Sequence, residues 1–176
     1  MAKGRSRVEV VDAILGAVPA SGAQAYESCG RTIVVVNRDA LPDVMRFLHQ
    51  DPEQAYEMLA DVTAVDYSPT EGQLHVVYQL SSIARKVRLT VKVKVPSDDA
   101  VVPSLTPIWK SADWAEREVW DMFGVRFTGH PNLKRILMYE EFEGHPLRKD
   151  YPVDRRQPLV EERDPINDPW PSRDGL

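Results

Sequence analysis

The chain has 176 residues and a formal net charge of −5 at pH 7. This length is sufficient for one domain with a hydrophobic core, and the negative charge argues against a nucleic-acid-binding protein, which usually carries a basic patch. The single cysteine, Cys29, excludes a disulfide framework and a cysteine-rich iron–sulfur or zinc site within this chain, and we expect it to be a small buried residue.

The first part of the chain predicts helices around a pair of short strands. Apolar residues recur at helical spacing before Pro19, and a β-branched run follows Gly30. Apolar residues at 41, 44, 47 and 48 would form the inward face of a second helix. The expected elements are a helix over 8–18, strands over 25–28 and 31–37, a helix over 40–49 and a shorter helix over 53–59.

From Asp61 the apolar residues alternate with polar ones, which predicts β-strands. The expected elements are strands over 61–67, 74–81 and 87–95, with a turn at 68–72 between the first two. The third strand alternates most regularly, with valine and leucine on one side and Arg88, Thr90, Lys92 and Lys94 on the other. Such a basic row is typical of a solvated face or a guarded sheet edge, and an acidic partner is the alternative.

The pattern as a whole predicts an α+β domain, with a mostly antiparallel sheet and helices packed on one face. Residues 96–107 contain three prolines and are expected to form a loop. We assign residues 1–150 to one domain and residues 151–176 to an extended proline-rich C-terminal tail. The prolines of this tail exclude a long helix or a central strand. Leu159, Ile166 and Trp170 would be isolated anchors for a partner, and a disordered tail in the free protein is compatible with this.

A further helix is expected between Asp113 and Gly124. Asp113 suits its N-cap, Glu116 would complete a capping box, and Gly124 would end it. Glu116 is a misfit, because the helical period places it near the apolar face. The same period places Arg117, Glu118 and Asp121 on the side opposite the apolar face. Arg117 lies four residues from both Asp113 and Asp121, so an acid one turn away on each side could hold it.

Two interpretations of this helix remain open. It is either a surface helix with ion pairs or a contact to another protein, in which the charges at 116–118 lie between Trp114 and Trp120. Large aromatic residues and arginine are the residue types that anchor interfaces. After the helix, we expect a short extended piece at 125–127 and a helical turn at 133–138.

His130 and His145 each lie in a Gly-His-Pro step. A repeated histidine suggests metal binding or acid–base chemistry, but neither has a second ligand three or four residues away and no cysteine helps. The proline after each histidine favours a structural role, in which the imidazole holds a loop by hydrogen bonds. Glycine-rich phosphate loops and the Gly-x-Ser-x-Gly elbow are absent from the sequence.

Two blocks of residues carry a family resemblance. The first contains Glu116-Arg117-Glu118, Asp121-Met122-Phe123-Gly124, Gly129-His130-Pro131, Leu133 and Arg135-Ile136-Leu137, and the second is Gly144-His145-Pro146-Leu147-Arg148-Lys149-Asp150-Tyr151-Pro152. In this order they closely resemble the signature of the 30 kDa subunit of respiratory complex I, which is also the C subunit of bacterial NADH-quinone oxidoreductase. The resemblance is tight over residues 105–152 and looser over 25–104.

The resemblance implies a non-catalytic structural subunit in the peripheral arm of a proton-translocating NADH:quinone oxidoreductase. The implied partners are the quinone-site subunit of the 49 kDa type and the small iron–sulfur subunit, and the implied location is peripheral, on the cytoplasmic side of the bacterial inner membrane. FMN, iron–sulfur clusters and quinone would be bound by partner subunits, with no cofactor, metal or catalytic residue in this chain. The expected partner interface comprises Glu116, Arg117, Glu118, Asp121, His130, Arg135, His145, Arg148, Lys149 and Tyr151.

Three alternatives remain. The chain could be the homologous subunit of a membrane-bound hydrogenase or formate-hydrogen-lyase complex, a stand-alone enzyme that uses His130 or His145, or a general protein-binding adaptor. No apolar run approaches the ~20 residues that a membrane-spanning helix needs, and the first residues lack the apolar core of a signal peptide. We therefore expect a soluble, intracellular protein.

Overall fold

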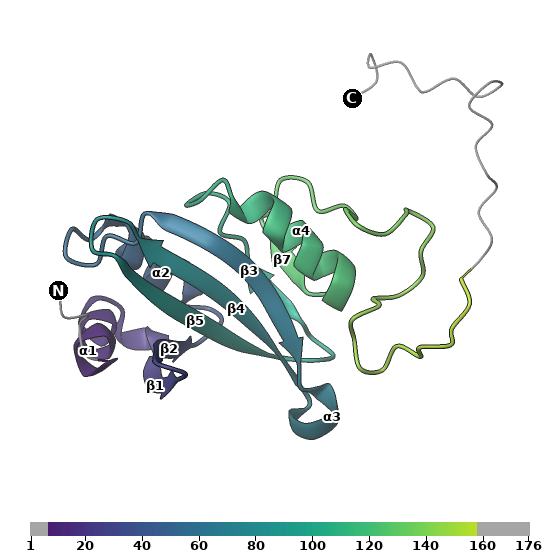
Figure 1. Cartoon of the computed structure of the whole chain (residues 1–176), viewed down its shortest axis with the longest axis horizontal. Coiled ribbons are helices and arrows are strands. Elements are labelled where there is room, and N and C mark those ends of the chain that lie inside the picture. The colour runs from purple at the N-terminus through teal and green to yellow at the C-terminus, as the bar shows by residue number, and fades with distance from the viewer. Residues whose placement is uncertain (1–6, 158–176) are drawn as a thin grey trace, which may run out of the picture.

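The computed structural model describes residues 7–157 of the chain. Its helices and strands form a twisted sheet with helices packed against it (Figure 1). In chain order they are α1 (Arg7–Ala17), the 3-10 helix η1 (Pro19–Ser21), β1 (Gln24–Ser28), β2 (Arg31–Val36), α2 (Leu41–Gln50), β3 (Met58–Asp66), α3 (Ser68–Glu71), β4 (Gln73–Ser82), β5 (Val87–Pro96), β6 (Val101–Pro103), α4 (Ala112–Phe123) and β7 (Arg126–Thr128).

Five strands form the main sheet in the order β1-β2-β5-β4-β3. Neighbouring strands are antiparallel, except that β2 and β5 are parallel. Helix α2 lies behind the sheet in the view of Figure 1, α1 packs against β1 and α2, and α4 packs along β3. The predicted fold class, a mostly antiparallel sheet with helices on one face, is therefore confirmed.

The core lies between the sheet and the helices. Alternate residues of β5, such as Leu89 and Val91, are almost fully buried, and Val91 pairs with Val34 of β2 and Tyr78 of β4. The other face of β5 carries the predicted basic row, of which Arg88 and Lys94 are exposed. Because β5 is the middle strand of the sheet, the edge-guard explanation of this row is wrong.

The predicted helix over residues 53–59 is wrong. Asp51 accepts hydrogen bonds from the backbone N–H groups of Glu53 and Gln54, and the Tyr56 N–H donates to Leu48. These bonds close turns after α2 instead of continuing a helix. Strand β3 then begins at Met58.

The connections after β3, β5 and β7 differ from the prediction. The expected turn at 68–72 contains the single-turn helix α3, and the expected loop at 96–107 contains β6, which pairs in parallel with β7. The extended piece expected at 125–127 agrees with β7 within one residue. The helical turn expected at 133–138 is wrong, because no helix forms there.

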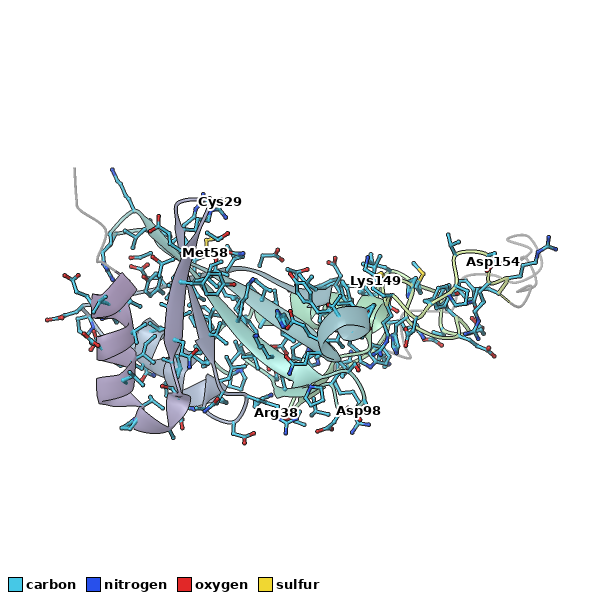
Figure 2. The ribbon with its side chains drawn as sticks, turned by 90° about the horizontal axis from the view of Figure 1, so that it is seen from below. Cys29, Arg38, Met58, Asp98, Lys149 and Asp154 are labelled. Atoms are coloured by element: carbon cyan, nitrogen blue, oxygen red, sulfur yellow. The ribbon has the colours of Figure 1, made fainter. Side chains whose placement is uncertain are left out.

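Cys29 is exposed, so the expectation of a buried cysteine is wrong. It occupies the turn between β1 and β2 with φ +50°, followed by Gly30 with φ +71°. Positive φ at both central residues is typical of the tight turns that join antiparallel strands. Figure 2 shows this turn projecting from the end of the sheet, where none of the described elements buries Cys29.

Residues 129–157 contain no helix or strand, and we call them the signature segment. They run from the end of β7 past α4 (Figure 1). Figure 2 shows Lys149 and Asp154 on this segment, at the end of the molecule away from α1. The predicted tail anchors Leu159, Ile166 and Trp170 lie outside the described residues, and the boundary at residue 150 stays a prediction.

Candidate partner interface

Helix α4 begins differently from the prediction and ends as predicted. Its N-cap position is Ser111, and no side chain caps it, so Asp113 is not the N-cap. Glu116 does not form a capping box either, because its carboxylate binds elsewhere. At the other end, Gly124 has φ +78° and its N–H donates to the Trp120 carbonyl at 2.8 Å, which confirms the C-terminal stop.

Glu116 lies inside the protein with no exposed surface. Its carboxylate accepts a hydrogen bond from the Ser104 hydroxyl and another from the Leu105 N–H, each 2.7 Å long. Burial raises the pKa of Glu116 to about 7, although these two hydrogen bonds act in the opposite direction. The side chain therefore ties α4 to the chain that leaves β6.

Asp121 is also fully buried, whereas the helical period placed it on the outer side of α4. One oxygen accepts the backbone N–H groups of Ile136, Leu137 and Met138 at 2.9–3.0 Å, and the other binds Arg135 at 2.5 Å. Burial acts to raise the pKa of Asp121, but these donors outweigh it and hold the pKa below its ordinary value. Asp121 thus fixes the backbone of the signature segment on α4.

Arg135 connects Asp121 to a second part of the signature segment. Its guanidinium lies 5.6 Å from the ring centre of Trp120 and 5.5 Å from that of Phe142. It also donates to the carbonyls of Phe142 and Gly144 at 2.7 and 3.1 Å. Several charge-assisted bonds therefore hold this irregular chain in one conformation.

Arg117 makes the same kind of contact from the exposed side of α4. It donates to the carbonyls of Lys134 and Arg135 at 3.1 and 2.9 Å, so the prediction that Asp113 and Asp121 hold it is wrong. Its guanidinium lies 5.4 Å from the ring centre of Trp114. Glu118, the third charged residue of this motif, is exposed.

Both histidines bind backbone atoms, as the structural interpretation predicts. His130 Nδ1 accepts the Asn132 N–H at 3.0 Å, so Nε2 carries the hydrogen and faces the Asp113 carbonyl at 3.1 Å. His145 Nδ1 lies 3.0 Å from the Asp121 carbonyl. The His145 ring also packs so closely on Gly124 that a Cβ there would lie 2.6 Å from His145 Cδ2.

The last part of the signature segment is bound to the ends of the sheet strands. The Lys149 N–H donates to the Asp66 carboxylate at 2.7 Å, and Arg148 binds Asp150 at 3.1 Å and the Ser97 carbonyl at 3.4 Å. The Tyr151 ring stacks on Phe142 with 6.0 Å between ring centres.

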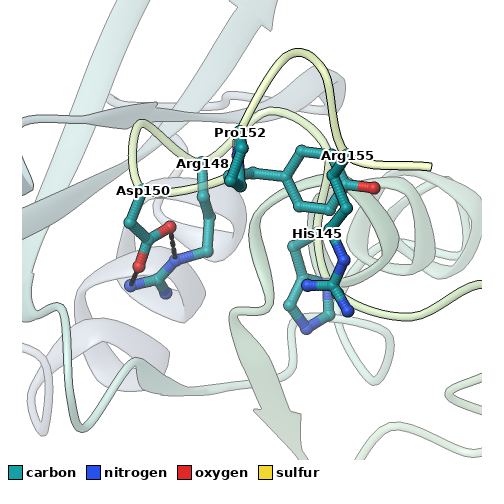
Figure 3. Close-up of a pocket in the computed structure, with 7 residues that line it drawn as sticks. His145, Arg148, Asp150, Pro152 and Arg155 are labelled. Atoms are coloured by element: carbon teal, nitrogen blue, oxygen red, sulfur yellow. Dashed lines mark hydrogen bonds and ion pairs between the residues drawn. The ribbon is translucent and has the colours of Figure 1, made fainter. Parts of the chain in front are cut away.

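A pocket of about 290 Å³ opens in this region. Figure 3 shows the Arg148–Asp150 pair on one side of it and His145 with Arg155 on the other. Arg155 is itself paired with Glu143 at 2.9 Å. The charges around the pocket are thus largely balanced within the chain.

Several large apolar side chains of this region are exposed, alongside charged ones such as Glu140 and Lys149. Trp114 is 66% exposed, Leu137 57%, Leu147 51% and Tyr139 40%. Large exposed apolar side chains mark interaction surfaces when they gather in one region. Of the expected interface residues, Glu116 and Asp121 have no exposed surface, whereas Glu118 and Lys149 are exposed. Trp114 agrees with the interface interpretation of α4, but the exposed side chains of Leu137, Tyr139 and Leu147 were not predicted as contacts.

Within residues 7–157 no group of three or more histidine, cysteine or acidic side chains is arranged to hold a metal ion. In the same part of the chain, no helix combines the length and apolar character needed to cross a bilayer.

Comparison with known proteins identifies the family. Residues 34–157 match the family model described as the respiratory-chain NADH dehydrogenase 30 kDa subunit. The C subunit of NADH-quinone oxidoreductase from Roseiflexus sp. (strain RS-1) is 45% identical over 149 residues, which cover 85% of this chain and 81% of that protein. The corresponding protein of Trichlorobacter lovleyi is 45% identical over 81% of this chain and 88% of its own length.

Solved structures agree with the sequence relatives. The trypsin-resistant fragment (1–134) of Nqo5 superposes with a TM-score of 0.60 at 32% identity, covering 73% of this chain and all of that fragment. A chain of the membrane-bound sulfane sulfur reductase, an archaeal respiratory membrane complex, superposes with a TM-score of 0.66 at 29% identity, covering 83% of this chain and 85% of its own. The chain therefore belongs to the family of the 30 kDa subunit of respiratory-chain NADH dehydrogenase, which includes the C subunits of bacterial NADH-quinone oxidoreductases.

Proposed function

We propose that the chain is a non-catalytic structural subunit in the peripheral arm of a proton-translocating NADH:quinone oxidoreductase. In this role it docks on the quinone-site subunit of the 49 kDa type, near the small iron–sulfur subunit. FMN, the iron–sulfur clusters and quinone are bound by partner subunits, and electrons pass from NADH to quinone without entering this chain. The complex holds it on the cytoplasmic side of the bacterial inner membrane.

The observation that carries this proposal is the way the signature segment is held. Its backbone is bound by Asp121 and Arg117 of α4 and by Arg135 of the segment itself. Their charged groups are occupied by these bonds, while Leu137 and Leu147 point outward. A surface that is ordered before binding loses less conformational entropy when a partner docks, which favours tight association.

The histidine contacts support a structural role over the stand-alone enzyme. Both ring nitrogens of His130 face polar groups of this chain, and its side chain has no exposed surface. A general base must reach a substrate proton within about 3 Å, and His130 cannot do so without breaking these bonds. The resulting role is to position the signature segment against α4.

A second candidate function is the homologous subunit in a related membrane complex that receives electrons from another donor. The likeness to a chain of the membrane-bound sulfane sulfur reductase favours it. Hydrogenase and formate-hydrogen-lyase complexes belong to the same group of candidates. The subunits that co-purify with the chain distinguish them, because flavin-binding NADH-input subunits accompany the first function and a nickel-site large subunit accompanies a hydrogenase.

The docking proposal is tested by placing charge on the apolar surface. We expect the double variant Leu137→Glu/Leu147→Glu to keep its fold, because both side chains are exposed, and to lose co-purification with the 49 kDa-type subunit. The matched control is Val8→Glu/Ile83→Glu, which adds the same charge at two side chains that are 58% and 68% exposed outside the signature segment. Equal recovery of the double variant and the control in the complex would refute the proposal.

A further inference from the structure

The outer face of the five-stranded sheet lies opposite the helices. Side chains of the inner face, such as Val91 and Tyr78, have no exposed surface. On the outer face, Tyr26 of β1 is 41% exposed and Val65 of β3 is 39% exposed, and Lys94 of β5 is exposed as well. Within residues 7–157, the helices therefore leave much of this face open to solvent.

This face has the opposite charge to the rest of the chain. Arg31 lies on the same face of β2 as Ile33, because alternate residues of a strand share a face. Ile33 pairs with Thr90 of the basic row of β5, so Arg31 lies on the face of that row. The charged side chains on this face of the strands and on α3 are the cations Arg31, Arg88, Lys92 and Lys94 and the acids Asp61 and Glu71. An excess of cations on a chain of net charge −5 indicates complementarity to an acidic surface.

A hollow of about 460 Å³ lies within this face. Tyr26 and Val35 line one part of it, Tyr67 and His75 line another, and Lys92 and Lys94 run between them on adjacent positions of the same strand face. The rings of Tyr67 and His75 lie 4.5 Å apart. The hollow thus combines aromatic and aliphatic walls with two ammonium groups.

The polar groups of the hollow are only partly satisfied within the chain. Lys92 Nζ donates to the Tyr26 hydroxyl at 3.1 Å, and Lys94 Nζ lies 3.9 Å from Glu71. His75 Nε2 is buried and lacks a hydrogen bond of good geometry, although it lies 3.3 Å from the same Glu71 carboxylate. The ammonium of Lys92 therefore has no carboxylate partner among the described residues.

We propose that this hollow is a second docking surface, and that its ligand is an acidic segment of a neighbouring subunit in the complex. Alternate residues of a strand are about 6.6 Å apart, so an extended partner segment with acids at alternate positions matches Lys92 and Lys94. The aliphatic part of such side chains packs against Tyr26 and Val35. This proposal rests on the proposed function, because the partner is a subunit of the same complex.

The test uses the complex purified from its own cells, with a photoreactive benzophenone amino acid in place of Val65. Val65 lies on the outer face beside His75, and its replacement leaves every residue of the hollow intact. We expect irradiation to cross-link this position to another subunit, within a peptide that contains acidic residues. The same change is then combined with Lys92→Gln/Lys94→Gln. This double substitution should lower the cross-linking yield about tenfold, which corresponds to about 1.4 kcal/mol for the loss of two ion pairs together.

Lys86→Gln/Lys110→Gln is the matched control, because it removes the same charge from two exposed lysines outside the hollow. The control yield should stay within about twofold of the unsubstituted chain, because these lysines do not line the surface. Three results would refute the second docking surface while leaving the proposed function standing, provided that the chain co-purifies with the complex. They are the absence of a cross-link, a cross-linked peptide without acidic residues, and an equal loss of cross-linking yield in both double variants. If the chain is found in no complex, the proposed function fails together with it.

Discussion

Replacement of the buried carboxyl group of α4 by an amide gives the most quantitative prediction. Glu116 has no exposed surface, and burial raises its pKa from 4.5 to about 7. In Glu116→Gln the amide oxygen can still accept the Leu105 N–H, and the amide N–H₂ can donate to the Ser104 hydroxyl. The variant therefore keeps the hydrogen bonds and removes the titration.

The sign of the effect follows from proton binding. Between pH 4.5 and 7 the unfolded chain has released the Glu116 proton while the folded chain still holds it. The free energy of unfolding of the wild-type chain therefore falls, through this group, as the pH rises through that window. The difference of about 2.5 pH units corresponds to about 3 kcal/mol, because one pH unit is about 1.4 kcal/mol.

Urea unfolding at several pH values measures this quantity. We expect the stability of Glu116→Gln relative to the wild-type chain to rise by about 3 kcal/mol between about pH 4.5 and 7.5 and to be constant above that. All other titrating groups are shared by the two chains, so their contributions cancel. A relative stability that is constant across the whole range would refute the reasoning about the buried carboxyl group.

Three further predictions concern folding and exposure. Gly124→Ala should destabilise the chain by about 1–3 kcal/mol in urea, because φ is +78° and the new Cβ would lie 2.6 Å from His145; unchanged stability would contradict this packing. Asp121→Asn should lower the free energy of unfolding by about 3 kcal/mol, since it leaves Arg135 without its buried carboxylate. It should also speed tryptic cleavage in the signature segment, and cleavage at the wild-type rate would contradict the role of Asp121 in holding that segment. The Cys29 thiol should react fully with a thiol reagent in the native chain, because it is exposed, and reaction only after unfolding would contradict the position of the turn.

The elements with a clear period could be predicted from the sequence. The alternation over β4 and β5 and the helical spacing over α1 and α2 depend on neighbouring residues only. Gly124 as the end of α4 is a local signal of the same kind. Each of these predictions agrees with the structure within one or two residues.

The chemistry of α4 could not be predicted in the same way. The partners of Asp121 lie 14–17 residues later in a segment without any period, so a helical projection places this acid in solvent. Glu116 has one visible signal, its position near the apolar face, but its partner Ser104 precedes it by 12 residues on an irregular chain. Acids that bind backbone N–H groups of distant loops are recognised only when those loops are located.

The exposure of the apolar residues in the signature segment could not be predicted from the sequence either. Leu137 and Leu147 lie between charged motif residues, and the sequence pattern favours the charged residues as the contact surface. In the structure the arginines bind carbonyl groups of the chain, and the leucines between them are left outside. Which member of a mixed motif faces outward depends on these long-range bonds.

The central claim is that the signature segment is the surface by which this chain docks. The most direct test is a photoreactive amino acid at Leu137, which is 57% exposed, in the complex as purified from its own cells. We predict a cross-link to the 49 kDa-type subunit, and none to it from the same amino acid at Ile83. Cross-linking from Ile83 and not from Leu137 would contradict the claim.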